Sequence, residues 1–338
     1  MNLSKPSQLI LIHKKIFSKK KVIFSGNIED SLPEILKTKN KIIHVQKYHF
    51  LKYLKNLKKK NIYIRFLIKK KKIQKYNTII YFFSKNKKET LFQLKNIISS
   101  LKKKSIIFLV GENKSGINSF VNFFKKNINF KKLNYGRKCT IYFYIINKKY
   151  KFNLKKYYKI HYLKNIPIIF LPGVFGYKKI DEGSKFLFSL LYKKKIIKKS
   201  ILDIGSGSGI LSIPFANKKY KNKITLSDSC LTSLKCSKKT FKLNNFNGKF
   251  KISNFYSNIK KKFDLIISNP PLHKNLKFST NFIKEIIYKA KFHLKKNGKL
   301  IIVSNRNLTC VKYIKKKFKK FKILKENKKF KIFQGSMN

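Results

Sequence analysis

The chain has 338 residues, enough for two domains of ordinary size, because single hydrophobic cores rarely grow beyond about 250–300 residues. Hydrophobic residues make up 43% of it, which excludes intrinsic disorder, and no apolar run approaches the roughly 20 residues of a membrane-spanning helix. The formal net charge of +71 points to a polyanionic partner.

The first half alternates short apolar runs with amphipathic stretches such as "TLFQLKNIISSLKK". Runs of this kind predict buried parallel strands covered by helices on both faces of a sheet. The predicted strands are 21–26, 41–45, 61–68, 77–83 and 105–111.

The second half repeats this pattern after an irregular lysine-rich segment, 147–163, which we interpret as a linker. We expect domains over 1–155 and 165–338, each an α/β domain of the Rossmann-like methyltransferase type. The order of elements in 77–113 also matches that in 263–306, which favours an internal duplication. The predicted strands of this half lie in 200–209, 223–229, 248–254, 263–269 and 298–305.

A glycine-rich loop, "ILDIGSGSG", follows the first strand of the second half. Glycines at alternate positions let the backbone approach a ligand closely, and the G-x-G-x-G spacing favours S-adenosylmethionine over a dinucleotide. An acidic side chain at the next strand end would accept both ribose hydroxyls. The predicted cofactor residues of these two strands are Asp203, Gly205, Gly207, Gly209 and Asp228.

Two further strand ends carry asparagine. Asn254 ends the third strand, where the adenine would lie, although a turn explains it nearly as well. Asn269 precedes Pro270 and Pro271 at the end of the fourth strand, the edge at which doubly wound sheets bind ligands. We interpret this tripeptide as a rigid clamp, in which the amide oxygen and a loop carbonyl accept hydrogen bonds from the exocyclic amine of a base.

The cysteines are scattered, without C-x-x-C or zinc spacing, so neither a disulfide framework nor a metal site is expected. We therefore expect a protein of the reducing cytoplasm. Lysine greatly outnumbers arginine, tryptophan is absent, and Ile, Asn, Phe and Tyr are abundant, a bias typical of A/T-rich genomes. Part of the basic charge is therefore compositional. The arginines are Arg65, Arg137 and Arg306.

At these motifs the chain resembles class I S-adenosylmethionine-dependent methyltransferases, and more narrowly the ribosomal RNA small subunit methyltransferase C family. The likeness extends through "IFSGNIEDSLPEIL", "VGENKSGI", "LPGVFG", "FDLIISNPPLH" and "FKIFQG". It implies methylation of the exocyclic N2 of a guanosine in 16S rRNA of the small subunit. It also implies a catalytic C-terminal domain and an N-terminal domain that supports folding and holds RNA.

The resemblance further implies that "DEGS", with Gly183 and Ser184, lies against the cofactor, although a helix N-cap explains it equally well. Leu272 stands where such clamps usually carry an aromatic residue that stacks on the flipped base. We expect a monomer that binds no membrane.

Two other functions stay open. A methyltransferase acting on a release-factor glutamine would use the same clamp, but its N-terminal domain would be small and helical. A ribosome-assembly or RNA-binding protein with a vestigial site would not bind the cofactor.

Overall fold

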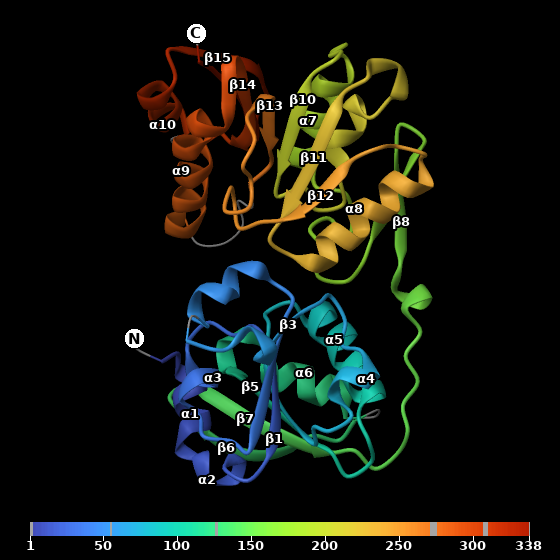
Figure 1. Cartoon of the computed structure of the whole chain (residues 1–338), viewed down its shortest axis with the longest axis vertical. Helices are drawn as coiled ribbons and strands as arrows, with labels where there is room; N and C mark the ends of the chain where they lie inside the picture. Colours follow the sequence, from blue (N-terminus) through green and yellow to red (C-terminus); the bar gives the residue numbers. More distant parts are fainter. Residues whose placement is uncertain (1–2, 55, 126–127, 271–275, 307–309, 338) are drawn as a thin grey trace. The chain divides into compact units, whose positions relative to one another are not determined.

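The computed structural model describes residues 3–54, 56–125, 128–270, 276–306 and 310–337. It divides into two compact units, Met1–Tyr157 and Tyr158–Asn338, which are drawn in blue to green and in green to red (Figure 1).

The first unit is built on a mixed sheet, which has seven strands in the described chain, in the order β3-β2-β1-β4-β5-β7-β6. β7 runs antiparallel to β5 and to β6, and the other pairings are parallel. Its helices are α1 Lys5–Ile12, α2 Lys14–Phe17, α3 Leu32–Ile35, α4 Lys70–Ile73, α5 Lys87–Ser100 and α6 Ile117–Phe124. Its strands are β1 Lys21–Gly26, β2 Asn40–Val45, β3 Ile62–Ile64, β4 Thr78–Phe82, β5 Ile106–Glu112, β6 Lys131–Gly136 and β7 Cys139–Ile145.

The second unit repeats this topology, with the described strands in the order β12-β11-β10-β13-β14-β16-β15, and adds a hairpin of β8 Lys159–Leu163 and β9 Ile166–Phe170. Its helices are α7 Glu182–Tyr192, α8 Leu231–Leu243, α9 Leu276–His293 and α10 Cys310–Lys317. Its sheet strands are β10 Ser200–Ile204, β11 Lys223–Asp228, β12 Lys249–Ile252, β13 Phe263–Ser268, β14 Leu294–Asn305, β15 Lys320–Glu326 and β16 Phe330–Ser336.

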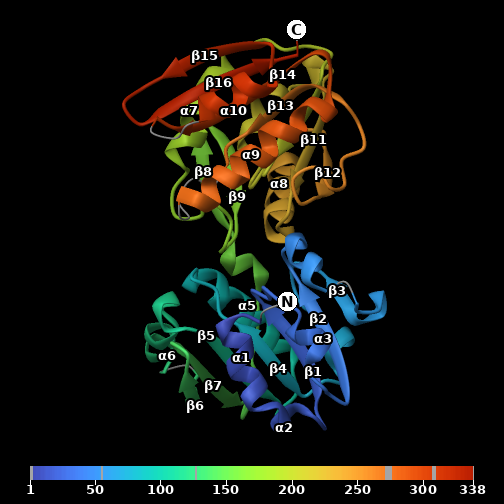
Figure 2. The same cartoon turned by 90° about the vertical axis from the view of Figure 1, so that its left-hand side faces the viewer.

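Each sheet is buried on both faces. Successive side chains of a strand point to opposite sides of the sheet, so each strand contributes to two hydrophobic cores. In β1, Val22 and Phe24 pack with α1 and α3, whereas Ile23 packs with α5 and α6 on the other face. In β10, Leu202 packs with α9 and Ile201 with α7 and α8. Figures 1 and 2 show the helices of each unit on both sides of its sheet. The predicted fold class, two tandem α/β domains of the methyltransferase type, is confirmed.

Two details differ from the predictions. The third strand is Ile62–Ile64 and not the whole of 61–68, because the chain leaves the sheet after Arg65. The expected linker contains β8, which turns into β9 through Lys164 and Asn165, both with positive φ. The lysine-rich composition concealed this hairpin, because alternating polar residues were interpreted as irregular chain.

Candidate active site

Strand register brings the predicted site residues of the second unit to one sheet edge. Ile204 of β10 lies opposite Ser268 of β13 on one side and opposite Ser227 of β11 on the other. The loops that follow these parallel strands therefore start side by side at the carboxyl edge, where doubly wound sheets bind ligands. The next residues along the three strands are Gly205, Asp228 and Asn269.

The glycine loop leaves open room beside its backbone. Gly205 and Gly207 have φ of +70° and +55°, and a Cβ added to either would meet nothing within 4 Å. Gly209, with φ of +86°, differs, because a Cβ there would lie 3.1–3.3 Å from Leu226, Phe241 and Ser237 side-chain atoms. The first two glycines therefore border a space that a ligand could enter, and the third allows close packing.

The segment after the loop is a 3-10 helix, η5 Ile210–Phe215. Pro214 lies inside it and lacks the N–H that a continuing α-helix would need.

Asp228 holds the glycine loop in place. Its Oδ2 accepts a hydrogen bond from Gly207 N at 2.9 Å, and its Oδ1 accepts one from Cys230 N at 2.7 Å, just before α8. Burial raises the pKa of Asp228, while these amide donors act in the opposite direction. The carboxylate therefore fixes the loop, and its expected contact with ribose hydroxyls stays a prediction.

Asp203 lies beneath the same loop and is fully buried. Its Oδ2 accepts a hydrogen bond from Ser212 Oγ at 2.8 Å. Burial, reinforced by the charge of Asp228, raises the pKa of Asp203 to about 7. In the described structure, three buried oxygens around the loop have no hydrogen-bonding partner: Asp203 Oδ1, Ser206 Oγ and Ser208 Oγ. Unpaired buried oxygens beside open room are suited to a polar ligand.

Asn254 forms a turn after β12. Its backbone N–H donates to Ser257 Oγ at 3.1 Å, and its carbonyl accepts from Ser257 N at 3.1 Å. The following residue, Phe255, has a positive φ. The turn is therefore present, and the expected adenine contact stays a prediction.

Asn269 is held by the "DEGS" segment at the start of α7. Its Nδ2 donates to Asp181 Oδ2 at 2.9 Å and to Ser184 Oγ at 2.7 Å. Because an ionised carboxylate only accepts hydrogen bonds, the amide must present its NH2 to Asp181, and this leaves Oδ1 as an acceptor. The site therefore offers a fixed carbonyl oxygen at the end of β13.

The same segment caps its helix, since Asp181 Oδ2 also accepts from Ser184 N at 2.8 Å. Gly183 lies between Asn269 and the first residue of β16, because an added Cβ would be 3.5 Å from Asn269 Oδ1 and 3.3 Å from Phe330 Cε1. The N-cap interpretation of "DEGS" is therefore confirmed, and the structure places the segment against Asn269. Its expected contact with the cofactor stays a prediction. The sequence did not identify Phe330 as a site residue, because only folding brings it to Gly183.

The rest of the clamp is partly described. Pro270 is buried. Pro271 and Leu272 lie outside the described residues, so their predicted roles stay predictions.

The described residues contain no group of three or more His, Cys, Asp or Glu side chains that could hold a metal ion. In the same part of the chain, no helix is both long and apolar enough to cross a membrane.

Comparison with known proteins identifies the family. Residues 165–334 match the family model of the methyltransferase small domain, and residues 7–161 match that of its N-terminal domain. A protein of Buchnera aphidicola subsp. Schizaphis graminum named ribosomal RNA small subunit methyltransferase C is 47% identical over 336 residues, 99% of each chain. One of the same name from Photorhabdus laumondii is 33% identical over 99% of this chain and 98% of its own.

A solved structure has the same fold. The T. thermophilus 16S rRNA N2 methyltransferase, in complex with AdoMet and guanosine, is 17% identical, with a TM-score of 0.81 over 99% of this chain and 92% of its own. The resemblance inferred from the sequence motifs is confirmed, and the chain belongs to the ribosomal RNA small subunit methyltransferase C family.

Proposed function

We propose that the protein transfers a methyl group from S-adenosylmethionine to the exocyclic N2 amine of a guanosine in 16S rRNA. The observation that carries this proposal is the Asn269 amide, whose orientation is fixed by Asp181 and Ser184 next to the glycine loop. Family membership supports the reaction class and the rRNA substrate.

The glycine loop fits the cofactor. Gly205 and Gly207 border open room, and unpaired buried oxygens lie around them, as a ligand with hydroxyl and ammonium groups requires. Asp228 and Asn254 would bind the ribose and the adenine, as the sequence predicts. S-adenosylmethionine supplies a methyl group that its positively charged sulfur has already activated.

The clamp residues would orient the base. Asn269 Oδ1 accepts a hydrogen bond from one N–H of the amine, and a carbonyl of the Asn-Pro-Pro loop accepts the other. These two bonds draw the nitrogen lone pair out of conjugation with the ring and direct it toward the methyl group. Positioning of this kind can supply much of the rate. Asp181 and Ser184 accept hydrogen bonds from Asn269 Nδ2 and so hold the amide in this orientation. A rotated amide would present its NH2 group, a donor, to the amine of the base.

Further expectations about RNA binding and about the place of action follow from rRNA as the substrate. The basic charge favours binding to rRNA phosphates in the small ribosomal subunit, and the first unit would support folding and hold RNA. We propose a monomer that acts in the cytoplasm, where ribosomes assemble.

The two alternatives fit less well. A release-factor glutamine methyltransferase was expected to have a small helical N-terminal domain, whereas the first unit contains a sheet with seven described strands. A vestigial site would have no reason to keep a bonded amide beside an open glycine loop.

The test is mass-spectrometric mapping of nucleosides in rRNA from small subunits treated with the protein and S-adenosylmethionine. We expect N2-methylguanosine with the native chain and roughly a hundredfold slower single-turnover transfer with Asn269→Ala, while cofactor affinity hardly changes. Asn217→Ala, at an exposed turn of the same unit, is the control. Methylation of a release factor in place of rRNA would refute the proposal.

A further inference from the structure

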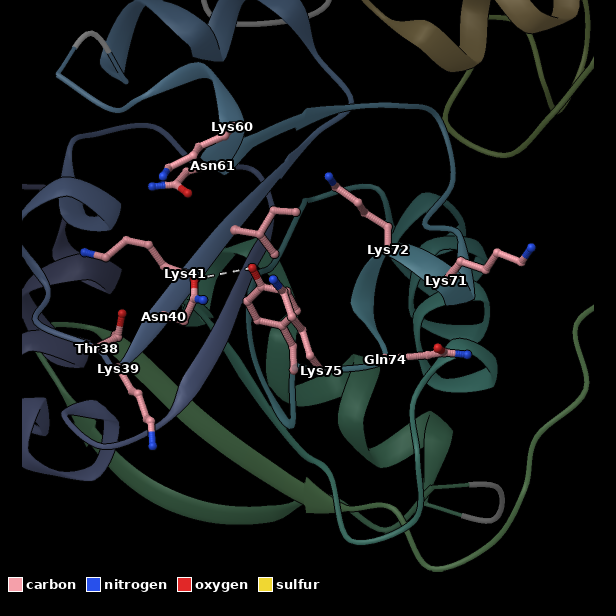
Figure 3. Close-up of a pocket in the computed structure, with 12 residues that line it drawn as sticks. Thr38, Lys39, Asn40, Lys41, Lys60, Asn61, Lys71, Lys72, Gln74 and Lys75 are labelled. Atoms are coloured by element: carbon pink, nitrogen blue, oxygen red, sulfur yellow. Dashed lines mark hydrogen bonds between the residues drawn. The ribbon is translucent and has the colours of Figure 1, made fainter.

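The first unit has a hollow at the amino ends of its strands, with a volume of about 870 Å³. Figure 3 shows lysine side chains around it, from the segments that enter β2, β3 and β4. Among its described lining residues there is no carboxylate. We call this surface the lysine hollow; its lysines are Lys39, Lys41, Lys60, Lys71, Lys72 and Lys75.

These lysines are not equivalent. Lys41 Nζ donates to the carbonyls of Pro33 and Leu36 at 2.9 and 2.6 Å, so it supports the wall of the hollow. Burial lowers the pKa of Lys41. The other five, Lys39, Lys60, Lys71, Lys72 and Lys75, are exposed, and their ammonium groups are therefore available to an anion in solution.

A neighbouring hollow of about 260 Å³ extends the surface. It shares Lys71 and Lys72 with the lysine hollow and adds Tyr63, Arg65 and Lys69. Within the described chain the Arg65 side chain has no hydrogen-bonding or ion-pair partner. Compositional bias explains an abundance of lysine, but it does not explain one of three arginines at this place. A guanidinium binds phosphate through two parallel hydrogen bonds, which an ammonium cannot do.

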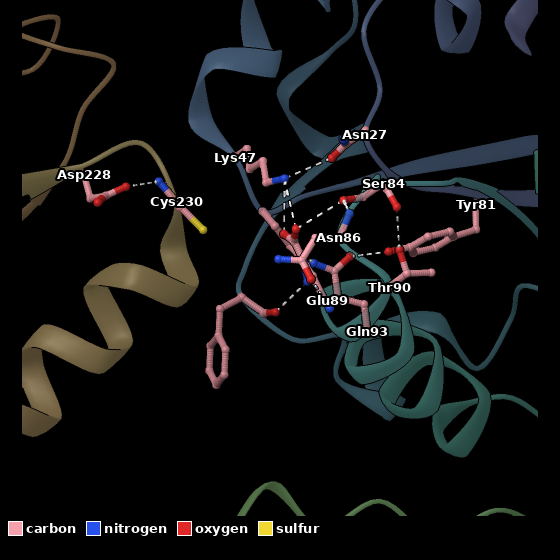
Figure 4. Close-up of polar contacts among 12 residues, drawn as sticks. Asn27, Lys47, Tyr81, Ser84, Asn86, Glu89, Thr90, Gln93, Asp228 and Cys230 are labelled. Carbon is pink, nitrogen blue, oxygen red and sulfur yellow. Dashed lines mark hydrogen bonds and ion pairs between the residues drawn. The ribbon is translucent and has the colours of Figure 1, made fainter. Parts of the chain in front are cut away.

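The opposite, carboxyl edge of the same sheet is filled by its own side chains (Figure 4). Lys47 Nζ lies 3.2 Å from Glu89 Oε1 and donates to Asn27 Oδ1 at 3.0 Å. Ser84 Oγ donates to Glu89 Oε2 at 3.3 Å. These residues follow β1, β2 and β4, which correspond by strand order to β10, β11 and β13 of the second unit. Among the described residues of the first unit, bonded side chains therefore lie where the second unit has its glycine loop, and an open basic surface lies at the other edge.

We propose that the lysine hollow and Arg65 bind the sugar–phosphate backbone of RNA. Because the surface is concave, several lysine side chains can converge on consecutive phosphates. Tyr63, which lines the neighbouring hollow with Arg65, adds an aromatic face on which an unpaired base can stack. The proposal depends on the proposed function only for the identity of the RNA as rRNA.

The experiment compares two triple variants of the full-length chain that lose equal charge. One is Lys60→Gln, Lys71→Gln, Lys72→Gln in the hollow, and the control is Lys14→Gln, Lys15→Gln, Lys19→Gln, exposed residues at and beside α2. Binding of a transcribed 16S rRNA is measured at several salt concentrations. Three lost phosphate contacts should lower the salt dependence by about 2 in log–log slope and the affinity at low salt by roughly tenfold or more.

The control triple should change affinity by less than about threefold, because it removes only distant charge. Arg65→Lys keeps the positive charge but loses the guanidinium group that can donate two parallel hydrogen bonds to a phosphate, so it should weaken RNA binding several-fold. S-adenosylmethionine affinity and the transfer rate at saturating RNA should stay native, which separates this proposal from the proposed function. Equal losses of RNA affinity in the hollow triple variant and the control triple variant would overturn the proposal. It would also be overturned if the hollow triple variant kept its RNA affinity but lost binding to anionic phospholipid vesicles.

Discussion

The contact between Ser184 and the Asn269 amide offers a direct test of the proposal that Ser184 positions this amide. Ser184→Ala removes one of two acceptors that hold Asn269 Nδ2, the one at 2.7 Å, and leaves Asp181 at 2.9 Å. A neutral hydrogen bond contributes about 1 kcal/mol, which corresponds to roughly a fivefold change in rate. We therefore expect kcat to fall about fivefold, while the affinity for RNA stays unchanged because phosphate contacts dominate it.

A double-mutant cycle makes the test specific. If Ser184 acts through Asn269, then Ser184→Ala should cause no further loss in the Asn269→Ala background, with a coupling energy of about 1 kcal/mol. Ser189→Ala is the matched control, because its hydroxyl donates to Phe186 O within the same helix. Single-turnover methyl transfer at saturating RNA and cofactor measures all four combinations. Losses that multiply independently would refute positioning of the amide by Ser184.

Two further predictions concern the cofactor loop. Gly207→Val would place a side chain in open room at a φ of +55°, so calorimetry should detect no S-adenosylmethionine binding to the full chain; unchanged affinity would contradict the placement of the cofactor at this loop. Asp203 ionises near pH 4 when unfolded and near pH 7 when folded, so the native state loses stability as pH rises between these values. Urea unfolding without cofactor measures the free energy of unfolding of Asp203→Asn and of the native chain. The variant's value minus the native value should rise by about 3 kcal/mol from pH 5 to pH 8, and a difference that does not change with pH would contradict the raised pKa.

The parallel strands could be predicted because they are short apolar runs, and β1, β10 and β13 end at or just before glycine or asparagine. The antiparallel strands β6, β7, β15 and β16 were not predicted, and in the first pair the turn lacks the usual residues. β6 and β7 are joined by Arg137 and Lys138, with φ of +53° and +62°, where hairpins of this kind favour Asn-Gly. In a lysine-rich chain such a turn cannot be distinguished from solvent-exposed surface.

The candidate site could also be predicted only in part. Gly205, Asp228 and Asn269 could be found because each directly follows or ends an apolar strand. The contacts between site residues could not be predicted. The hydrogen bond from Asn269 to Ser184 joins residues 85 positions apart, and the family resemblance placed Ser184 against the cofactor without indicating that α7 starts beside β13. The cap motif was visible, but its second role depends on the tertiary structure.

The placement of carboxylates argues that the site is functional. The chain has 12 acidic residues against 83 basic ones, and exposed salt bridges contribute little to stability, so carboxylates with internal partners are the informative ones. Every aspartate of the chain lies among the described residues and accepts a hydrogen bond: Asp30, Asp181, Asp203, Asp228 and Asp264. Three of these five lie around the glycine loop and Asn269, and one of them, Asp203, is buried with an oxygen that has no partner in the described structure. A fold maintained only for RNA binding would not need a buried carboxylate that costs stability at neutral pH, and this argues for a site that still binds its cofactor.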